Sequence, residues 1–320
     1  MERMVLPVIV GVQFERGTSQ LSRASREVIQ GAASITDGPI WALSPSPEPD
    51  PSALGERGVE RLFVSENAGR LAAASADLIN AAISENGPVG AVLLPGTYWG
   101  KETAAHLSAL LDAGVSIDVD QVSVEDGLLA ASKSILGGSW DSEFKIERGV
   151  PVIALSGSAK FTEKRDPVDC VEVPLAIEVR PEIAAVVVES AQAATGDAAA
   201  RLSEAEVAVI GGRGAEENFA LVGALANSLG GAVGATRVAC DEGWVDRSLQ
   251  VGQTGVTISP RVYVGVGVSG AIHHTCGMQG AEVVVAICDD PDAPIFEIAD
   301  FGIVGDVNEV LPQAIKALGR

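Results

Sequence analysis

The sequence predicts an α/β fold of two domains, each a parallel sheet between layers of helices (α/β/α), with a doubly wound, dinucleotide-binding C-terminal domain. Apolar runs of strand length alternate with amphipathic segments of helix length, a pattern typical of parallel sheets with crossover helices. Gly-rich turns follow the expected strands after residue 205, as in cofactor-binding α/β domains. An Ala-rich polar stretch at 189–206 has little to bury, so we place the boundary near residue 194, between domains 1–193 and 194–320.

The N-terminal domain is expected to begin with a buried strand in the apolar run at 4–12, which lacks the flanks and cleavage site of a secretory signal. The Pro-rich segment 44–52 is expected to form a loop. Helices are expected at 18–33, 69–85 and 101–114, and further strands at 38–44, 59–66 and 87–95. Segment 115–190 is predicted to be rich in strands, with Val and Ile runs at 150–155, 168–173 and 183–188.

The strongest local motif of the C-terminal domain is the set Gly265, Gly267 and Gly270, which fits GxGxxG. It lies between an expected strand at 261–267 and an expected helix in SGAIHHTCGM, which opens with a small polar residue suited to capping. Without Cβ atoms the backbone can approach a pyrophosphate, whose charge faces the N–H groups and positive end of the helix. The motif favours a phosphate-bearing cofactor; the alternative is a turn that only packs a helix on a strand.

The neighbouring segments extend this pattern. A strand, a Gly-rich turn, a helix and a second strand are expected over 205–243, and a last strand and helix over 294–315. The strand expected at 281–288 ends in Asp289 and Asp290, about 20 residues past the last glycine, where a dinucleotide-binding fold places its ribose-binding acid. From these features alone, NAD and FAD fit equally well.

Five motifs follow one another in this half of the chain. They are GGRG at 211–214, GATR at 234–237, QVGQTG at 250–255, GVGVSGAIHH at 265–274 and APIFEIADFGIVGD at 293–306. Together they resemble the FAD-binding domain of the electron transfer flavoprotein alpha subunit. Two of the five motifs, QVGQTG and APIFEIADFGIVGD, are specific to that family. The resemblance extends through residues 205–320 in order and without large gaps.

The resemblance implies that the cofactor is FAD. The residues that match the family's cofactor-binding positions are Arg213, Thr236, Arg237, Val251, Gly252, Gln253, Thr254, Ser269, Gly270, Ala271, Ile272, His273, His274, Cys288, Asp306 and Val307. Arg237 matches a guanidinium placed over the flavin ring, where a permanent cation favours negatively charged flavin. Thr254 and His274 match groups near flavin N5 and O2, the turn 269–272 matches the phosphate-binding turn, and Asp306 matches the adenosine end.

Two positions depart from the family pattern. The usual SGAIQH is SGAIHH here, and His273 is expected to matter little because the backbone N–H can serve the phosphate whichever side chain follows. The usual AIN is AIC here, with Cys288 in place of Asn. A thiol is a weaker hydrogen-bonding group than a carboxamide, so this change is expected to weaken FAD binding unless Asp289 or water substitutes.

Other site chemistries fit less well. Neighbouring side chains on a helix point about 100° apart, so His273 and His274 make a poor chelate and no metal is expected. The GVSGA sequence around Ser269 lacks the last glycine of a GxSxG nucleophile elbow, because Ala271 stands there. A hydrolase is therefore not expected.

The composition excludes several classes of partner. A net charge of −21 opposes nucleic-acid binding, because phosphate contacts require clustered Lys and Arg. No apolar run approaches the ~20 residues of a membrane span, so no membrane insertion is expected. The four cysteines form no CxxC pair, which indicates reduced thiols and a cytoplasmic location.

The resemblance further implies an electron carrier and not an enzyme. In that family, FAD takes electrons from acyl-CoA or related dehydrogenases and passes them to a respiratory-chain quinone oxidoreductase. The expected partner is an electron transfer flavoprotein beta subunit, paired through the N-terminal domain in a heterodimer, and a swivel about 189–206 is a further hypothesis. Two alternatives are an NAD-linked dehydrogenase using GxGxxG at 265–270 and a structural subunit that lost flavin through the Cys288 change.

We predict that Cys288→Asn tightens FAD binding, because asparagine offers the adenosine both a donor and an acceptor. Titration of the apoprotein with FAD measures the effect. Unchanged or weaker retention in the variant would reject this account of the Cys288 departure.

Overall fold

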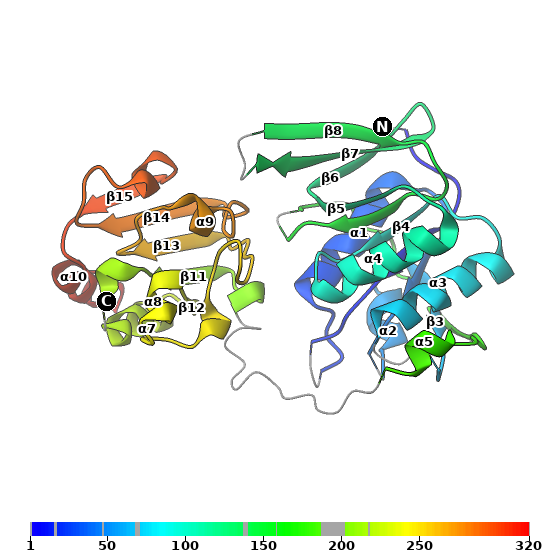
Figure 1. Ribbon diagram of the computed structural model, residues 1–320, viewed down its shortest axis with the longest axis horizontal. Coiled ribbons are helices and arrows are strands. Elements are labelled where there is room, and N and C mark those ends of the chain that lie inside the picture. Colours follow the sequence, from blue (N-terminus) through cyan, green and yellow to red (C-terminus); the bar gives the residue numbers. More distant parts are fainter. Residues whose placement is uncertain are drawn as a thin grey trace. The chain divides into compact units, whose positions relative to one another are not determined.

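The computed structural model describes residues 2–15, 18–46, 48–67, 71–136, 140–157, 159–186, 202–216 and 218–319 (Figure 1). They form two compact units, the first made mainly of residues before 187 and the second mainly of residues after 201. The predicted boundary near residue 194 and most of the predicted linker at 189–206 lie outside the described residues. Within the described chain, no helix combines the length and the apolar character that a membrane span requires.

The first unit is built on a seven-stranded parallel sheet. Its strands are, in spatial order, β10 (Val171–Pro174), β3 (Val59–Val64), β2 (Ile40–Leu43), β1 (Val8–Gly11), β4 (Ala91–Leu94), β9 (Val152–Leu155) and β5 (Val115–Val119). Every residue of β1, β2, β4 and β9 is buried. Central parallel strands read as continuous apolar runs because both of their faces are covered, which is why these strands could be predicted from the sequence.

Helices cover both faces of this sheet. Val8 and Val10 belong to the core under α1 (Arg23–Ile35), whereas Ile9 belongs to the core under α3 (Ala72–Asn86) and α4 (Tyr98–Leu111). Successive side chains of a strand point to opposite faces, so one strand serves both cores. The α/β/α prediction for this domain is confirmed.

Two features of the first unit differ from the sequence-based prediction. A three-stranded antiparallel sheet, β6 (Gln121–Glu125), β7 (Leu128–Ile135) and β8 (Trp140–Ile146), adds a layer that was not predicted. Its first hairpin turns at Asp126 and Gly127, with φ values of 54° and 75°, which match the type I′ turn that Asp-Gly favours. The Asp-Gly dipeptide is the sequence feature from which this hairpin could have been predicted.

The second difference concerns the Val and Ile run at 183–188. Its described beginning is helical, because α5 spans Pro181–Ala184. Proline at the first helical position fixes a helical φ and has no N–H to leave unpaired, so it starts a helix and not a strand. The expectation of a strand is wrong for residues 183 and 184. A second short helix, α2 (Pro51–Gly55), also begins at a proline, at the end of the segment expected to be a loop.

The second unit contains a five-stranded parallel sheet. Its strands are, in spatial order, β12 (Ala232–Ala235), β11 (Val207–Gly211), β13 (Val262–Val266), β14 (Val283–Cys288) and β15 (Phe301–Val304). From β11 the chain runs to its neighbour β12 on one side and then crosses back to β13 on the other side of β11. The strand order therefore reverses between β11 and β13. In open α/β sheets, ligands bind at such a switch point, beyond the carboxyl ends of the strands.

The two faces of this sheet are covered differently. Helices α7 (Phe219–Ser228) and α10 (Val307–Leu318) pack on one face. The other face is covered by Val251 and Ile258 of a loop, by Met278 and by Ile295 of the short turn η4 (Pro294–Glu297). The doubly wound fold class is confirmed, with irregular segments forming much of one layer.

Candidate functional site

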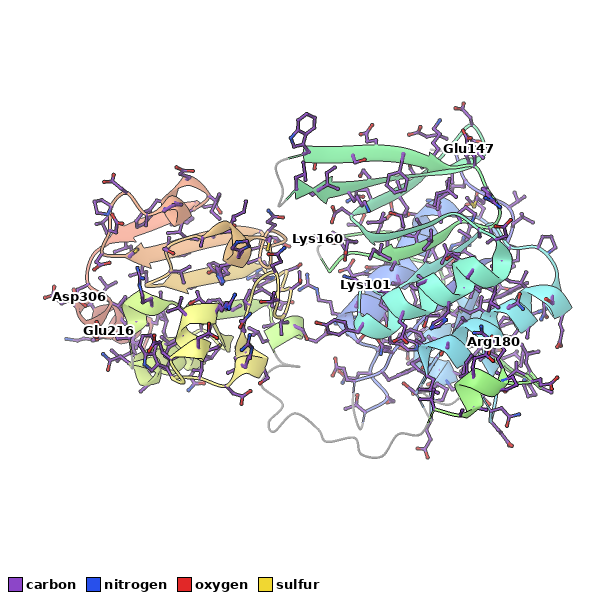
Figure 2. The ribbon with its side chains drawn as sticks, viewed as in Figure 1. Lys101, Glu147, Lys160, Arg180, Glu216 and Asp306 are labelled. Carbon is purple, nitrogen blue, oxygen red and sulfur yellow. The ribbon has the colours of Figure 1, made fainter. Side chains whose placement is uncertain are left out.

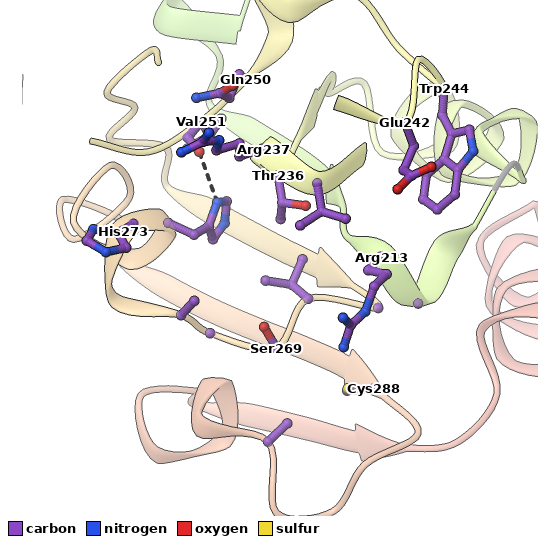
Figure 3. Close-up of a pocket in the computed structure, with 18 of the residues that line it drawn as sticks. Arg213, Thr236, Arg237, Glu242, Trp244, Gln250, Val251, Ser269, His273 and Cys288 are labelled. Carbon is purple, nitrogen blue, oxygen red and sulfur yellow. Dashed lines mark hydrogen bonds between the residues drawn. The ribbon is translucent and has the colours of Figure 1, made fainter. Parts of the chain in front are cut away.

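A cavity of about 1040 Å³ lies at the carboxyl ends of β11, β12, β13 and β14 (Figure 3). It therefore occupies the switch point of the second sheet. Its volume is at the upper end of the range for small-molecule sites, as an extended ligand requires. The predicted site residues that line it are Arg213, Thr236, Arg237, Val251, Gln253, Thr254, Ser269, Gly270, Ala271, His273, His274 and Cys288.

Four predicted residues are outside this lining. Gly252 packs against the backbone of a lining residue, since a Cβ on it would meet the carbonyl oxygen of His273 at 2.5 Å. Ile272 is 57% exposed on the short helix α9 (Ile272–Thr275). Asp306 (Figure 2) caps α10, where its Oδ1 accepts a hydrogen bond of 2.7 Å from the backbone N–H of Asn308, and Val307 is the buried first residue of that helix. The cofactor-binding roles of these four residues remain predictions.

Two sets of labelled side chains lie apart from each other in Figure 3. Arg213, Ser269 and Cys288 lie toward one side of the view, whereas Arg237, Gln250 and His273 lie toward the other. The cavity thus offers a cation and a hydroxyl in one part and a second cation with amide and imidazole groups in another. Such a distribution suits a long ligand with a charged linkage and a polar ring.

Glycine backbone builds the wall between the β11 and β13 turns. The N–H of Gly212 donates to the carbonyl of Val266 at 2.8 Å, and that of Gly214 donates to the carbonyl of Gly267 at 2.9 Å. Gly267 has a φ of 62°, and a Cβ on it would stand 2.4 Å from the backbone carbon of Gly214. Only glycine fits this contact, because a side chain would clash and the positive φ is unfavourable for other residues.

The turn after β13 differs from the predicted capped helix. Helix α9 has four residues, its N-cap is Ala271, and no side chain caps it, so Ser269 does not act as predicted. Gly270 has a φ of 85°, and the chain bends there before the helix begins. A four-residue helix has little macrodipole, so the attraction of this turn for an anion comes mainly from its backbone N–H groups.

Arg237 begins the short helix α8 (Arg237–Asp241), and its side chain is 67% exposed. Its Nε donates to Oδ2 of Asp241 at 3.1 Å, and Nη1 of Arg247 lies 3.7 Å from the other oxygen of the same carboxylate. An exposed ion pair of this kind contributes little to stability. Its effect is to restrain the direction of the Arg237 guanidinium at the cavity.

His274 is 6% exposed and hydrogen-bonded through both ring nitrogens. Nδ1 lies 3.0 Å from the carbonyl oxygen of Val251, and Nε2 lies 2.8 Å from the hydroxyl of Tyr263. A carbonyl only accepts, so Nδ1 carries the hydrogen and Nε2 accepts from Tyr263. Burial lowers the pKa of His274 to about 4, although the hydrogen bond to Val251 opposes this shift. A hydrogen bond from His274 to a ligand would have to replace one of these two.

The adjacent histidine has different surroundings. His273 is exposed, and its Nδ1 lies 2.8 Å from Oε1 of Gln253. The two imidazoles therefore point in different directions, as expected for neighbours on a helix. Within the described parts of the chain, no three His, Cys, Asp or Glu side chains are grouped so that they could hold a metal ion.

Sequence reasoning missed several side chains that line the cavity, which are Glu216, Val238, Glu242, Trp244, Gln250, Val268 and Ala293. Gln250 is the first residue of the QVGQTG motif, so the motif could have indicated it. Cofactor-binding roles were assigned only from Val251 onward. Its Nε2 donates to Oγ1 of Thr254 at 2.9 Å, while its buried Oε1 has no partner within the described residues. The wall of glycine backbone at Gly214 and Gly267, with the guanidinium of Arg213 in the same lining, fits a phosphate-bearing cofactor in this cavity.

We predict that neutral His274 makes the stability of the second unit depend on pH. A histidine takes up its proton near pH 6.5 when unfolded, whereas the folded pKa of His274 is about 4. Its stabilising contribution is therefore complete above about pH 6.5 and is lost as the pH falls toward 4. Denaturant unfolding measured across this pH range is expected to show a loss on the order of 3 kcal/mol in the free energy of unfolding. Hydrogen exchange of β11 and β13 assigns that loss to the second unit.

The matched controls are His274→Gln and His106→Gln. The first is expected to be less stable at pH 7 but to lose this part of the acid dependence. The second removes a partly exposed histidine of α4 and should change neither property. If the acid dependence persists in His274→Gln, it does not come from His274 and the prediction is wrong.

Comparisons with known proteins bear directly on this site. A family model described as the electron transfer flavoprotein FAD-binding domain matches residues 201–279, and one described as the electron transfer flavoprotein domain matches residues 10–173. The electron transfer flavoprotein subunit alpha of Mycobacterium leprae (strain TN) is 37% identical over 312 residues, covering 94% of this chain and 95% of that protein.

Two further relatives carry the same name. That of Mycobacterium tuberculosis (strain ATCC 25618 / H37Rv) is 36% identical over 317 residues, covering 96% of this chain and 97% of that protein. That of Bacillus subtilis (strain 168) is 38% identical over 229 residues, covering 69% of this chain and 68% of that protein. The resemblance seen in the motifs is confirmed, and the cofactor of the matched domain is FAD. This chain therefore belongs to the electron transfer flavoprotein alpha subunits, FAD-dependent electron-transfer proteins that are not catalytic enzymes and that pair with a beta subunit.

Proposed function

We propose that the cavity of the second unit holds FAD and that this flavin carries electrons from acyl-CoA or related dehydrogenases to a respiratory-chain quinone oxidoreductase. The observation that carries the proposal is the convergence of Arg237, Thr254 and His274 on one cavity. These residues come from separate segments of the chain, and each matches a flavin-contacting position of the family. The FAD-binding description of the model that matches residues 201–279 supports the same assignment.

In this proposal the two groups of lining residues serve opposite ends of the cofactor. The isoalloxazine lies toward Arg237, Thr254 and His274, and the phosphates and adenosine lie toward Arg213, Ser269 and Cys288. Flavin supplies the electron-accepting and electron-donating ring, so the protein needs no nucleophile or general base. The backbone N–H groups of the turn at 269–272 and the guanidinium of Arg213 offset the phosphate charge.

The residues around the ring end set the charge and the hydrogen-bonding groups there. Arg237 provides a permanent cation, which favours negative charge on a bound flavin. His274 stays neutral near pH 7 because its pKa is about 4, so it contributes a fixed dipole and no titrating charge there. Thr254 accepts a hydrogen bond from Gln250 and thereby keeps its own hydrogen free to donate into the cavity.

Partners and location complete the proposal. The first unit pairs with the beta subunit, in line with the match of residues 10–173 to the electron transfer flavoprotein domain. The dehydrogenases would include those of fatty acid oxidation. We place the protein in the cytoplasm, where its four free cysteines, Cys170, Cys240, Cys276 and Cys288, stay reduced.

The first test is the identity of the bound cofactor. The chain is produced with its beta subunit, purified, and denatured to release any cofactor for chromatography. We expect a yellow complex that releases FAD and whose flavin is reduced by an acyl-CoA dehydrogenase with its substrate. Release of NAD, absence of any nucleotide, or a flavin that no dehydrogenase of this class reduces contradicts the proposal.

The second test concerns the cation at the ring. Arg237→Leu is expected to lower the one-electron reduction potential of the bound flavin by on the order of 60 mV, a tenfold change in the equilibrium constant. Arg247→Leu is the matched control, because Arg247 contacts the same carboxylate of Asp241 but does not line the cavity. Equal shifts in both variants, or no shift in Arg237→Leu, would place Arg237 away from the flavin.

A further inference from the structure

The side chain of His273 is hydrogen-bonded to the QVGQTG segment at the cavity. Its Nδ1 lies 2.8 Å from Oε1 of Gln253, and both residues line the cavity. Figure 3 shows His273 on the side opposite to Arg213 and Cys288. The imidazole therefore lies in the part of the cavity assigned to the isoalloxazine, although the sequence comparison gave this side chain no role.

Backbone contacts hold His273 and Gln253 together. The N–H of Gln253 donates to the carbonyl of His273 at 2.8 Å, and Sγ of Cys276 donates to the same carbonyl at 3.4 Å. A Cβ on Gly252 would stand 2.5 Å from that carbonyl oxygen, so no side chain fits between this segment and α9. Because the two backbones are fixed in contact, the side chains of His273 and Gln253 meet even though both are exposed.

The two adjacent histidines bind the same segment from different sides. Nδ1 of the buried His274 donates to the carbonyl of Val251 at 3.0 Å, whereas Nδ1 of the exposed His273 bonds the Gln253 side chain. Neighbouring side chains on a helix point about 100° apart. This separation makes the pair a poor chelate for a metal, but it lets the pair hold one segment at two points.

The bond from His273 fixes which end of the Gln253 carboxamide a ligand meets. A carboxamide oxygen only accepts, so Nδ1 of His273 carries the hydrogen and Oε1 of Gln253 accepts it. The two N–H groups on Nε2 are then the part of the carboxamide left to donate to a ligand. Without the histidine, the carboxamide could turn and present its oxygen instead.

We propose that His273 is a positioning residue of the flavin site, which holds Gln253 so that the carboxamide N–H groups donate to acceptor atoms of the isoalloxazine. The ring gains negative charge when it takes up an electron, and donors aimed at it stabilise the reduced form more than the oxidised form. His273 itself does not need to touch the ring. This inference rests on the proposed seat of FAD in the cavity.

The test measures the one-electron reduction potential of the bound flavin in the complex with the beta subunit. His273→Leu removes the donor at Nδ1 and allows the Gln253 carboxamide to turn. We expect this change to lower the equilibrium constant for one-electron reduction about threefold, which is on the order of 30 mV.

His273→Asn is the rescue variant. The side-chain nitrogen of asparagine is a donor and stands as many bonds from Cα as Nδ1 of histidine does. It can therefore donate to Oε1 of Gln253, and the potential should stay close to that of the unchanged protein. If the potential of His273→Asn falls as far as that of His273→Leu, the hydrogen bond is not the cause and the inference is wrong.

Thr275→Val is the matched control. Thr275 belongs to the same short helix α9 and is not part of the cavity lining, and its hydroxyl donates to the carbonyl of Ile272 at 3.3 Å. The change removes a side-chain hydrogen bond from the helix and leaves the bond to Gln253 in place, so the potential should not move. A shift equal to that of His273→Leu would show that loosening of α9 is responsible, which rejects the role of His273.

A double substitution tests whether His273 acts through Gln253. In a Gln253→Met background the carboxamide is absent, so His273→Leu should cause no further shift in potential. A full additional shift means that His273 acts on the flavin independently, and it contradicts the positioning role. If His273→Leu does not assemble with the beta subunit, His273→Ala replaces it in every comparison.

The outcomes also separate this inference from the proposed function. A complex that contains FAD, with equal potentials in the unchanged protein and in His273→Leu, overturns the role of His273 and leaves the flavin assignment intact. An unchanged complex that binds no FAD overturns the proposed function and, with it, this inference.

Discussion

The contact between the turns after β11 and β13 is the constraint on which the second unit depends. Gly212 and Gly214 donate hydrogen bonds to carbonyls at the end of β13, and Gly267 faces Gly214 with no room for a side chain. These turns leave the sheet at the point where the strand order reverses. Because the backbones touch, the two loops form one continuous part of the cavity wall, to which Gly214 and Gly267 belong.

The remaining walls place fixed charges and dipoles around that backbone. Arg237 is restrained by Asp241 at the start of α8, whereas His274 is held neutral by burial and by its bonds to Val251 and Tyr263. Gln250 is held by its own backbone and donates from Nε2 to the hydroxyl of Thr254. None of these groups needs to change its charge near neutral pH. A site of this kind is suited to an electron carrier, whose protein part holds a redox group in a defined electrostatic environment.

The fold class and the order of most elements followed from local patterns. Buried parallel strands such as β1 and β13 are continuous apolar runs, and helices such as α1 are amphipathic, so both can be recognised one segment at a time. The antiparallel β6–β8 sheet was not separated from the parallel strands, because strand propensity does not say which strand is the neighbour. The length of α9 was also missed. The polar residue before it predicted a cap, but the positive φ of Gly270 bends the chain past Ser269.

The sequence by itself determined the family, the cofactor class and most of the residues that line the cavity, because glycine spacing and the QVGQTG and SGAIHH motifs are local properties of the chain. Only the tertiary structure decided which hydrogen bonds those residues make. The pairing of His274 with Tyr263 and the unpaired oxygen of Gln250 depend on distances between atoms on different segments. A motif records which side chains are present, whereas the partners left for a ligand depend on which atoms the packed fold has already satisfied.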